Sequence, residues 1–268
     1  MFGQPIKSSL SPVIQRTFAQ QFGLEIEFKR IETGADGFGE ALESFRLKGG
    51  LGCNITLPLK RCAWQLAVDA SPDASRAQAA NTLVAQPSSG WFAHNTDGAG
   101  LVVDLTGNQG LNLAGLRILV LGAGGAATGI MASLLAENPW QVVLVNRDLA
   151  RALAVAKRFE SLGTIGVTSW ADLSEQGGFD LVINATSMGQ HGEAPPLEPT
   201  LFAPGAVCYD LNYNKAGQPL KKLCEEMGQG YIDGLGMLVE QAAKSFYIWT
   251  GKQPDTCGVI DACKRDIG

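Results

Sequence analysis

Two residues of the N-terminal third, Lys60 and Asp97, have the chemistry to move a proton to and from an alcohol. A ketone that accepts a hydride becomes an alkoxide, which must be protonated, and the reverse reaction must remove that proton. A lysine near a helix N-terminus and partly removed from water can have its pKa lowered into a useful range. A neighbouring carboxylate opposes that shift, but it orients the ammonium group and can bind a substrate hydroxyl. The alternative for Lys60 is an ordinary solvated surface charge.

Two clusters of polar residues surround this pair in the sequence. Ser8-Ser9-Leu10-Ser11-Pro12 crowds hydroxyls at a predicted helix start, where they could hold a carboxylate. Equally, Ser11 suits the N-cap of that helix without any ligand. The second cluster comprises Asn54-Ile-Thr56-Leu-Pro58-Leu-Lys60, Asn81-Thr82 and Asn95-Thr96-Asp97-Gly98. Each part lies in or just after a predicted strand, so its polar groups could meet at the carboxyl edge of one sheet, where α/β proteins bind ligands.

A glycine-rich turn follows later in the chain and indicates a dinucleotide. Gly122-Ala123-Gly124-Gly125-Ala126-Ala127 matches G-x-G-x-x-A directly after a predicted strand and at the opening of a helix. Gly122 permits a tight turn, Gly124 lets the backbone approach a pyrophosphate, and the helix N–H groups can bind its oxygens. Glycines often serve only close packing, but here strand, turn, helix and second strand follow one another as the motif requires.

The end of the next predicted strand distinguishes between cofactors. NAD-binding proteins usually have Asp or Glu there, to bind the ribose 2′-hydroxyl. This chain has Asn146-Arg147, with Arg151 four residues beyond. Two guanidinium groups at a helix start could clamp the 2′-phosphate of NADP. The alternative is a pair of solvated arginines.

The elements that must position these residues alternate between strand and helix. In the first hundred residues we predict a helix starting at Ser11-Pro12 with Ile14, Phe18 and Phe22 on one face, and a second helix over Asp36–Leu47 with Asp36 as N-cap. Strands are predicted over 26–31, 52–57, 80–85 and 91–94, with a further helix after Pro58.

The pattern then becomes more regular. Strands are predicted over 117–121, 141–145, 165–168, 181–184 and 206–209, and helices over 124–137 and 149–162. Repeated β-α-β units predict a parallel, doubly wound sheet. A last helix over Met237–Thr250, with Gly251 at C′, returns to the first lobe. The predicted fold is therefore α/β with two lobes: a substrate-binding and catalytic domain of residues 1–98 plus 236–268, and an NADP-binding Rossmann domain of residues 99–235.

Composition excludes several other classes of function. A net charge of -5 argues against nucleic acid as a partner, because phosphate binding needs clustered Lys and Arg. The uncharged stretch Ile118–Ala136 is almost long enough to span a membrane, but its four glycines favour a buried strand, turn and helix. Only two histidines are present, so no metal site is expected. Six scattered cysteines without a C-x-x-C pair favour reduced thiols and a cytoplasmic location.

At these residues the chain resembles the shikimate dehydrogenase family almost from end to end. The matching segments are Gly3–Ile6, Ser9–Pro12, Asn54–Lys60, Ala80–Thr82, Asn95–Gly98, Gly122–Ala126, Asn184–Ser187, Tyr209-Asp210 and Asp233–Leu238 followed by Gln241. Any one could arise by chance, but their order and spacing together are specific. The resemblance implies reversible, NADPH-dependent reduction of 3-dehydroshikimate to shikimate, a step of aromatic amino-acid biosynthesis.

The resemblance also implies a role for each matching residue. By similarity, Ser9 and Ser11 hold the substrate carboxylate with Tyr213 close by, and Thr56, Asn81 and Gln241 hold ring hydroxyls. Lys60 and Asp97 are the catalytic pair and also contact substrate. The cofactor residues are Gly122, Ala123, Gly124, Gly125 and Ala126 at the pyrophosphate, Asn146, Arg147 and Arg151 at the adenosine phosphate, and Leu211 and Gly234 at the nicotinamide.

Three positions depart from the family pattern. Ser8 and Gln15 stand where many members have histidine, and Asp148 stands where the family has threonine. A carboxylate at 148 could repel the 2′-phosphate, or it could cap the following helix as threonine does. Two other functions stay open: a quinate/shikimate dehydrogenase using NAD or NADP, and a non-catalytic dinucleotide-binding sensor. We expect a monomer or homodimer that binds small molecules, with no membrane partner.

Overall fold

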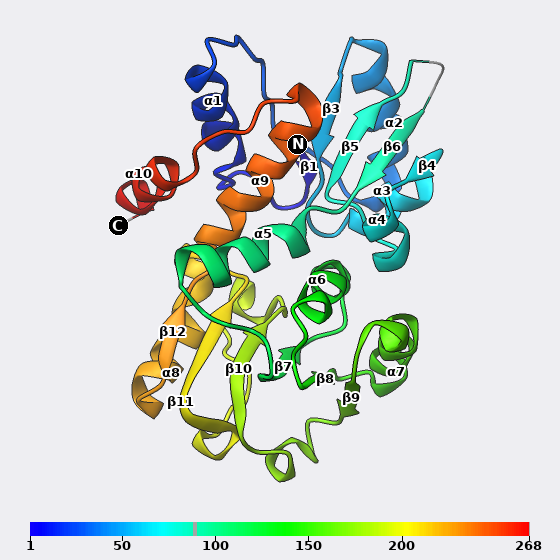
Figure 1. Cartoon of the computed structure of the whole chain (residues 1–268). Helices are drawn as coiled ribbons and strands as arrows, with labels where there is room; N and C mark the ends of the chain where they lie inside the picture. Colours follow the sequence, from blue (N-terminus) through cyan, green and yellow to red (C-terminus); the bar gives the residue numbers. More distant parts are fainter. Residues whose placement is uncertain (88–89, 268) are drawn as a thin grey trace. The chain divides into compact units, whose positions relative to one another are not determined.

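The computed structural model describes residues 1–87 and 90–267, which divide into two compact units. Unit 1 is formed by Met1–Val103 and Leu238–Gly268, and unit 2 by Asp104–Met237. The chain therefore enters and leaves unit 2 once (Figure 1). The predicted boundaries, 98/99 and 235/236, lie a few residues earlier, because α5 (Asp97–Val103) continues as one helix beyond Gly98.

Unit 2 contains a six-stranded sheet in which every pairing is parallel. The strand order is β12-β11-β10-β7-β8-β9. The bounds are β7 Arg117–Leu121, β8 Gln141–Val145, β9 Ile165–Thr168, β10 Phe179–Asn184, β11 Phe202–Asp210 and β12 Gly230–Ile232. This order is that of the Rossmann fold, and it confirms the predicted doubly wound sheet. The order reverses between β7 and β10, which is where such sheets bind ligands.

The helices of unit 2 connect these strands. They are α6 Gly125–Ala136, α7 Leu149–Phe159 and α8 Gln218–Met227, with a π-helical turn over Asp104–Asn108. The apolar stretch Ile118–Ala136 is β7, a turn and α6 (Figure 1). Most of its residues are buried, which explains its apolar character. Among the described residues, no helix has the length and apolar character needed to cross a bilayer.

Unit 1 contains a four-stranded mixed sheet of order β3-β5-β6-β4 and a short parallel pair, β1-β2. The bounds are β1 Phe2–Gly3, β2 Ile31–Glu32, β3 Gly52–Asn54, β4 Asp69–Ala70, β5 Thr82–Ala85 and β6 Trp91–His94. The helices are α1 Ser11–Gln21, α2 Ala35–Leu47, α3 Lys60–Leu66, α4 Pro72–Ala77 and α5. Phe2, Phe38, Leu59 and Leu83 are among the fully buried side chains of its core.

The C-terminal segment supplies α9 (Leu235–Thr250) and α10 (Cys257–Ile267). The predicted return of this segment to the first lobe is confirmed: the ring of Phe246 packs 5.8 Å from that of Phe18, and Trp249 Nε1 donates to the Leu83 carbonyl at 3.1 Å. Gly251 has φ +70°, as the predicted C′ position requires. Helix α10 was not predicted.

Three local predictions were wrong. Residues 26–30 form no strand, because only Ile31–Glu32 pairs with β1. Gly34, not Asp36, is the N-cap of α2. Leu10, not Ser11, is the N-cap of α1, and no side chain caps that helix.

Candidate functional site

Lys60 and Asp97 form a close ion pair in unit 1. Lys60 Nζ lies 2.6 Å from Asp97 Oδ2, and their side chains are 15% and 5% exposed. Each residue is the first of its helix, Lys60 in α3 and Asp97 in α5. The predicted placement of Lys60 at a helix N-terminus is confirmed. A nearly buried ammonium with a fixed carboxylate can hold or release a proton at a defined atom.

Asn81 joins the pair to a third element. Its Nδ2 lies 2.9 Å from Asp97 Oδ1 and 3.1 Å from Gln241 Oε1 on α9. Its Oδ1 accepts the backbone N–H of Thr96 at 2.9 Å, which fixes the amide orientation. The two oxygens of Asp97 therefore have different partners, Lys60 on one and Asn81 on the other. Four of the predicted substrate residues, Lys60, Asn81, Asp97 and Gln241, are thus brought together.

A buried hydrogen-bond network supports this group from behind. Ser245 Oγ lies 2.7 Å from Thr82 Oγ1, accepts from Asn54 Nδ2 at 3.0 Å and donates to the Gln241 carbonyl at 3.0 Å. Ser245 is fully buried. Ser245 lies within the predicted last helix, for which no site role was expected beyond Gln241. The sequence did contain an indication of a buried polar contact: Ser245 stands between Ala242 and Phe246, at a position of the helix where an apolar residue is expected.

Gln15 lies at the far end of the same network. Its Nε2 donates to the Ala242 carbonyl at 3.1 Å, while its buried Oε1 has no partner among the described residues. The position where the family often has histidine is therefore inside the core, on the inner face of α1.

The segment Ser8–Ser11, here called the serine loop, leads into the start of α1. Ser9 Oγ donates to Ser11 Oγ at 3.2 Å and accepts the Ser11 N–H at 3.3 Å. Ser11 thus turns toward Ser9 rather than capping the helix, which is why the N-cap prediction failed. Thr56 is half-buried at the turn before α3, where its N–H donates to the Phe2 carbonyl at 3.0 Å.

The glycine-rich turn of unit 2 fits a dinucleotide phosphate. Gly122 has φ +104°, which only glycine adopts readily, and Gly124 is the N-cap of α6 without a capping side chain. The first turn of α6 carries no acidic residue, so its N–H groups are open to phosphate oxygens. Arg151 Nε donates to the Ala123 carbonyl at 2.9 Å and keeps a guanidinium beside the turn.

Asp148 caps α7. Its Oδ1 accepts the Arg151 N–H at 3.1 Å, and its carbonyl accepts from Asn146 Nδ2 at 2.9 Å. The capping interpretation of this departure from the family is confirmed. Arg147 is exposed at the end of β8, next to the cap. Asn146, Arg147 and Arg151 therefore lie at or near the start of α7, and their contact with a phosphate stays a prediction.

The remaining predicted cofactor residues, Leu211 and Gly234, lie just after the carboxyl ends of β11 and β12. Leu211 N donates to the Asn184 carbonyl, and Gly234 N to the Asn212 carbonyl, each at 3.0 Å. Beside them Asp210 is buried, and one of its oxygens accepts from Asn184 Nδ2 at 3.0 Å and Asn212 Nδ2 at 2.8 Å. Burial raises the pKa of Asp210 to about 6, against the opposing effect of these hydrogen bonds.

Tyr213 belongs to unit 2, whereas Ser9 and Ser11 belong to unit 1. Its predicted place beside the substrate carboxylate therefore stays a prediction. No group of three His, Cys, Asp or Glu side chains suited to a metal occurs in residues 1–87 and 90–267.

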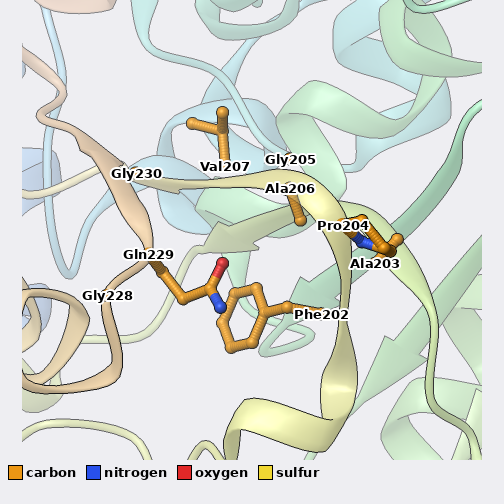
Figure 2. Close-up of a pocket in the computed structure, with 9 residues that line it drawn as sticks. All are labelled: Phe202, Ala203, Pro204, Gly205, Ala206, Val207, Gly228, Gln229 and Gly230. Atoms are coloured by element: carbon orange, nitrogen blue, oxygen red, sulfur yellow. The ribbon is translucent and has the colours of Figure 1, made fainter.

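A pocket of about 440 Å³ lies elsewhere in unit 2, where β11 and β12 begin (Figure 2). Its lining is mostly backbone and apolar, from Phe202–Val207 and Gly228–Gly230, with Gln229 as the polar side chain. Parallel strands put their amino ends at the edge opposite the glycine turn, so this pocket is separate from the cofactor residues.

Comparisons with known proteins agree with this geometry. Three family models match: the shikimate dehydrogenase substrate binding domain over residues 1–83, shikimate / quinate 5-dehydrogenase over 104–191, and the shikimate 5′-dehydrogenase C-terminal domain over 234–263. A curated relative from Alkalilimnicola ehrlichii, shikimate dehydrogenase (NADP(+)), is 46% identical over 99% of this chain and 98% of its own.

Solved structures give the same result. The Ael1 enzyme from Pseudomonas putida is 39% identical with a TM-score of 0.88, over 97% of this chain and 96% of that one. Shikimate 5-dehydrogenase from Thermus thermophilus, in complex with NADP(H) and shikimate, is 31% identical with a TM-score of 0.82. The match covers 98% of this chain and 97% of that one. The chain therefore belongs to the shikimate dehydrogenase family.

Proposed function

We propose that this protein is an NADP-dependent shikimate dehydrogenase, which reversibly reduces 3-dehydroshikimate to shikimate in aromatic amino-acid biosynthesis. The observation that carries the proposal is the Lys60–Asp97 pair, held at 2.6 Å in a nearly buried setting and bonded to Asn81. The relatives named above, which share nearly the whole length of the chain, support the same substrate and cofactor.

The protein's own groups handle the proton. In the reducing direction, the Lys60 ammonium donates a proton to the oxygen of the reacting carbonyl as that oxygen gains negative charge. Asp97 holds Nζ by an ion pair, accepts from Asn81 Nδ2 on its other oxygen, and offers carboxylate oxygens that can accept from a ring hydroxyl. In the oxidising direction the Lys60 amine takes the hydroxyl proton. When bound, NADP would supply or accept the hydride at the carbon of the reacting carbonyl.

The remaining polar residues bind and orient the substrate. Ser9 and Ser11 offer hydroxyls to the carboxylate, and Thr56 and Gln241 offer groups to the ring hydroxyls. Gln241 is supported in this role by its bond to Asn81, which places its side chain among the catalytic residues. Such fixed donors reduce the orientational freedom that the reaction must otherwise remove.

The cofactor half of the proposal assigns residues Gly122–Ala126 to the pyrophosphate and Arg147, Arg151 and Asn146 to the adenosine phosphate. The uncapped α6 N-terminus and the Arg151 contact with the turn support this assignment. Leu211 and Gly234 are assigned to the nicotinamide. A cytoplasmic location and a monomeric or homodimeric state are also part of the proposal. Light scattering of the purified protein tests the latter.

Initial rates with shikimate and quinate, each with NAD and NADP, test the function. We expect the highest kcat/KM for shikimate with NADP, because two arginines lie at the predicted 2′-phosphate site and the nearby Asp148 carboxylate is used as the cap of α7. A preference for quinate would identify the protein as a quinate/shikimate dehydrogenase. Binding of NADPH without any shikimate-dependent reduction of NADP would refute the enzyme and favour the sensor.

A further inference from the structure

We propose that Arg30 is a positioning residue for the substrate carboxylate, acting through the serine loop, and that it makes the site selective for anionic over neutral ring substrates. This inference rests on the proposed function. Arg30 matches none of the family segments found in the sequence.

The contact that carries the inference is a two-donor clamp. Arg30 Nη2 and Nε donate to the Ser9 carbonyl at 2.6 and 3.2 Å. Ser9 N donates to the Ile6 carbonyl at 3.1 Å, and Ser9 Oγ is bonded to both the hydroxyl and the N–H of Ser11. Every polar group of Ser9 therefore has a partner, and the direction of its hydroxyl is set by these bonds.

Arg30 can act as a clamp because its own backbone is fixed. It directly precedes β2, whose Ile31 N donates to the Met1 carbonyl at 2.9 Å. On its other side, the Met1 ammonium donates to the Lys29 carbonyl at 2.6 Å. Arg30 is thus anchored on the β1-β2 pair, and the chain leading to the serine loop starts from β1 of the same pair. This chain is therefore held at its start by the strand pairing and at Ser9 by Arg30.

The charge of Arg30 is also available to a ligand. The guanidinium bonds to a neutral carbonyl, and within the described residues no Asp or Glu oxygen lies at ion-pair distance from it. The neighbouring Lys29, by contrast, pairs with Glu27 at 2.7 Å. An unneutralised cation bonded to the Ser9 backbone, next to the two serine hydroxyls proposed to hold the carboxylate, favours a carboxylate over an uncharged group at that loop.

A hollow of about 330 Å³ beside Arg30 makes the residue suitable for substitution. It is lined by Pro12, Val13, Arg16, Phe28, Lys29, Arg30 and Ile31, so a shorter side chain at 30 leaves no closed cavity. Arg16 lines the same hollow but donates to the Phe28 carbonyl at 3.2 Å and not to Ser9. It is therefore the matched control for loss of a nearby positive charge.

The test compares Arg30→Gln with Arg16→Gln, using shikimate and its uncharged methyl ester at saturating NADP. For Arg30→Gln we expect kcat/KM on shikimate to fall about tenfold through KM, with kcat and the ester kcat/KM changed by less than about twofold. A weakly bound ester can still be compared, because kcat/KM is measured at ester concentrations below its KM. Arg30→Lys, which keeps a cation, should show a smaller loss that is again confined to shikimate.

Three results would overturn the inference: equal losses on shikimate and ester, a loss confined to kcat, or an equal loss in Arg16→Gln. The first would mean a general structural role and the last a bulk charge effect. If Arg30→Gln does not fold, the same comparison of shikimate and ester in Arg30→Lys tests the inference. A wild-type protein inactive on shikimate would instead refute the proposed function.

Discussion

At the scale of single residues, Lys60 and Asp97 are 37 positions apart in the chain, yet their charged atoms are 2.6 Å apart. Removing water from both side chains strengthens their interaction and fixes the ammonium at one position. Asp97 is held by Asn81 on its other oxygen. In the proposed mechanism, proton transfer depends on Lys60.

Lys60→Ala should lower kcat for shikimate oxidation by about 10²-fold or more, the usual size of a proton-transfer contribution. The KM for NADP should be nearly unchanged, because the cofactor residues lie in unit 2. Steady-state kinetics with both substrates varied measures this. Lys48→Ala, at an exposed lysine, is the control. A comparable loss of NADP affinity would show that Lys60 has been given the wrong role.

Arg147→Ala should raise the KM for NADP about tenfold while changing that for NAD by less than about twofold, since only NADP has a phosphate for the guanidinium to bind. Kinetics with each cofactor at saturating shikimate measures the difference. Lys157→Ala removes an exposed cation further along α7 and should affect neither. Equal increases for both cofactors would place Arg147 away from the 2′-phosphate.

At the scale of elements, α5 and α9 are in close contact at Gly100. A Cβ at this position would lie 2.6 Å from both the backbone N and the Cβ of Gln241, closer than packed atoms allow. The small residue thus permits the approach that brings Gln241 to Asn81 and Asn81 to Asp97. The geometry of the proposed catalytic group depends on this helix crossing as well as on its own hydrogen bonds.

Gly100→Ala should therefore destabilise the protein by about 1–3 kcal/mol and lower kcat/KM for shikimate, because overpacking must move one helix. Thermal unfolding and steady-state kinetics measure the two effects. Gly107→Ala is the control, since a Cβ there has no neighbour within 4 Å and the backbone needs no positive φ. An unchanged midpoint and unchanged kinetics in Gly100→Ala would mean that α9 shifts without cost.

At the scale of the whole molecule, one buried acid links stability to pH. Asp210 is fully buried, one of its oxygens has no partner among the described residues, and its pKa is raised from 3.8 to about 6 by burial. The native protein therefore binds more protons than the unfolded chain between these values. The contribution of Asp210 is fully present below about pH 4 and is lost as pH rises through 6.

Asp210→Asn should accordingly leave the free energy of unfolding almost unchanged at pH 4 and raise it at pH 7. A shift from 3.8 to about 6 corresponds to about 3 kcal/mol at most. Urea unfolding of wild type and variant at both pH values measures the difference, and the subtraction cancels the other titrating groups. A variant that is less stable than wild type at pH 7 would contradict the raised pKa.

Much of unit 2 could be predicted from the sequence because its determinants are local. β7, β8 and β9 have the predicted bounds, since continuous apolar runs flanked by polar residues define buried parallel strands. The Gly122 turn was predictable because its positive φ requires glycine and the motif places that glycine directly after a strand. Short strands such as β1 and β2 were not, because they are defined by their partner and not by their own composition.

The α/β class, the dinucleotide turn and, through the order of the motifs, the family can all be inferred from the amino acids alone. Which polar residues meet depends on the folded chain: Lys60 with Asp97, Asn81 with Gln241, and Arg30 with Ser9. The physical reason is that propensity and periodicity act over a few residues, whereas these hydrogen bonds join elements brought together by burial of apolar faces elsewhere. Ser245 shows the same limit, because a hydroxyl on an apolar helix face acquires its role only from the strand that packs against it.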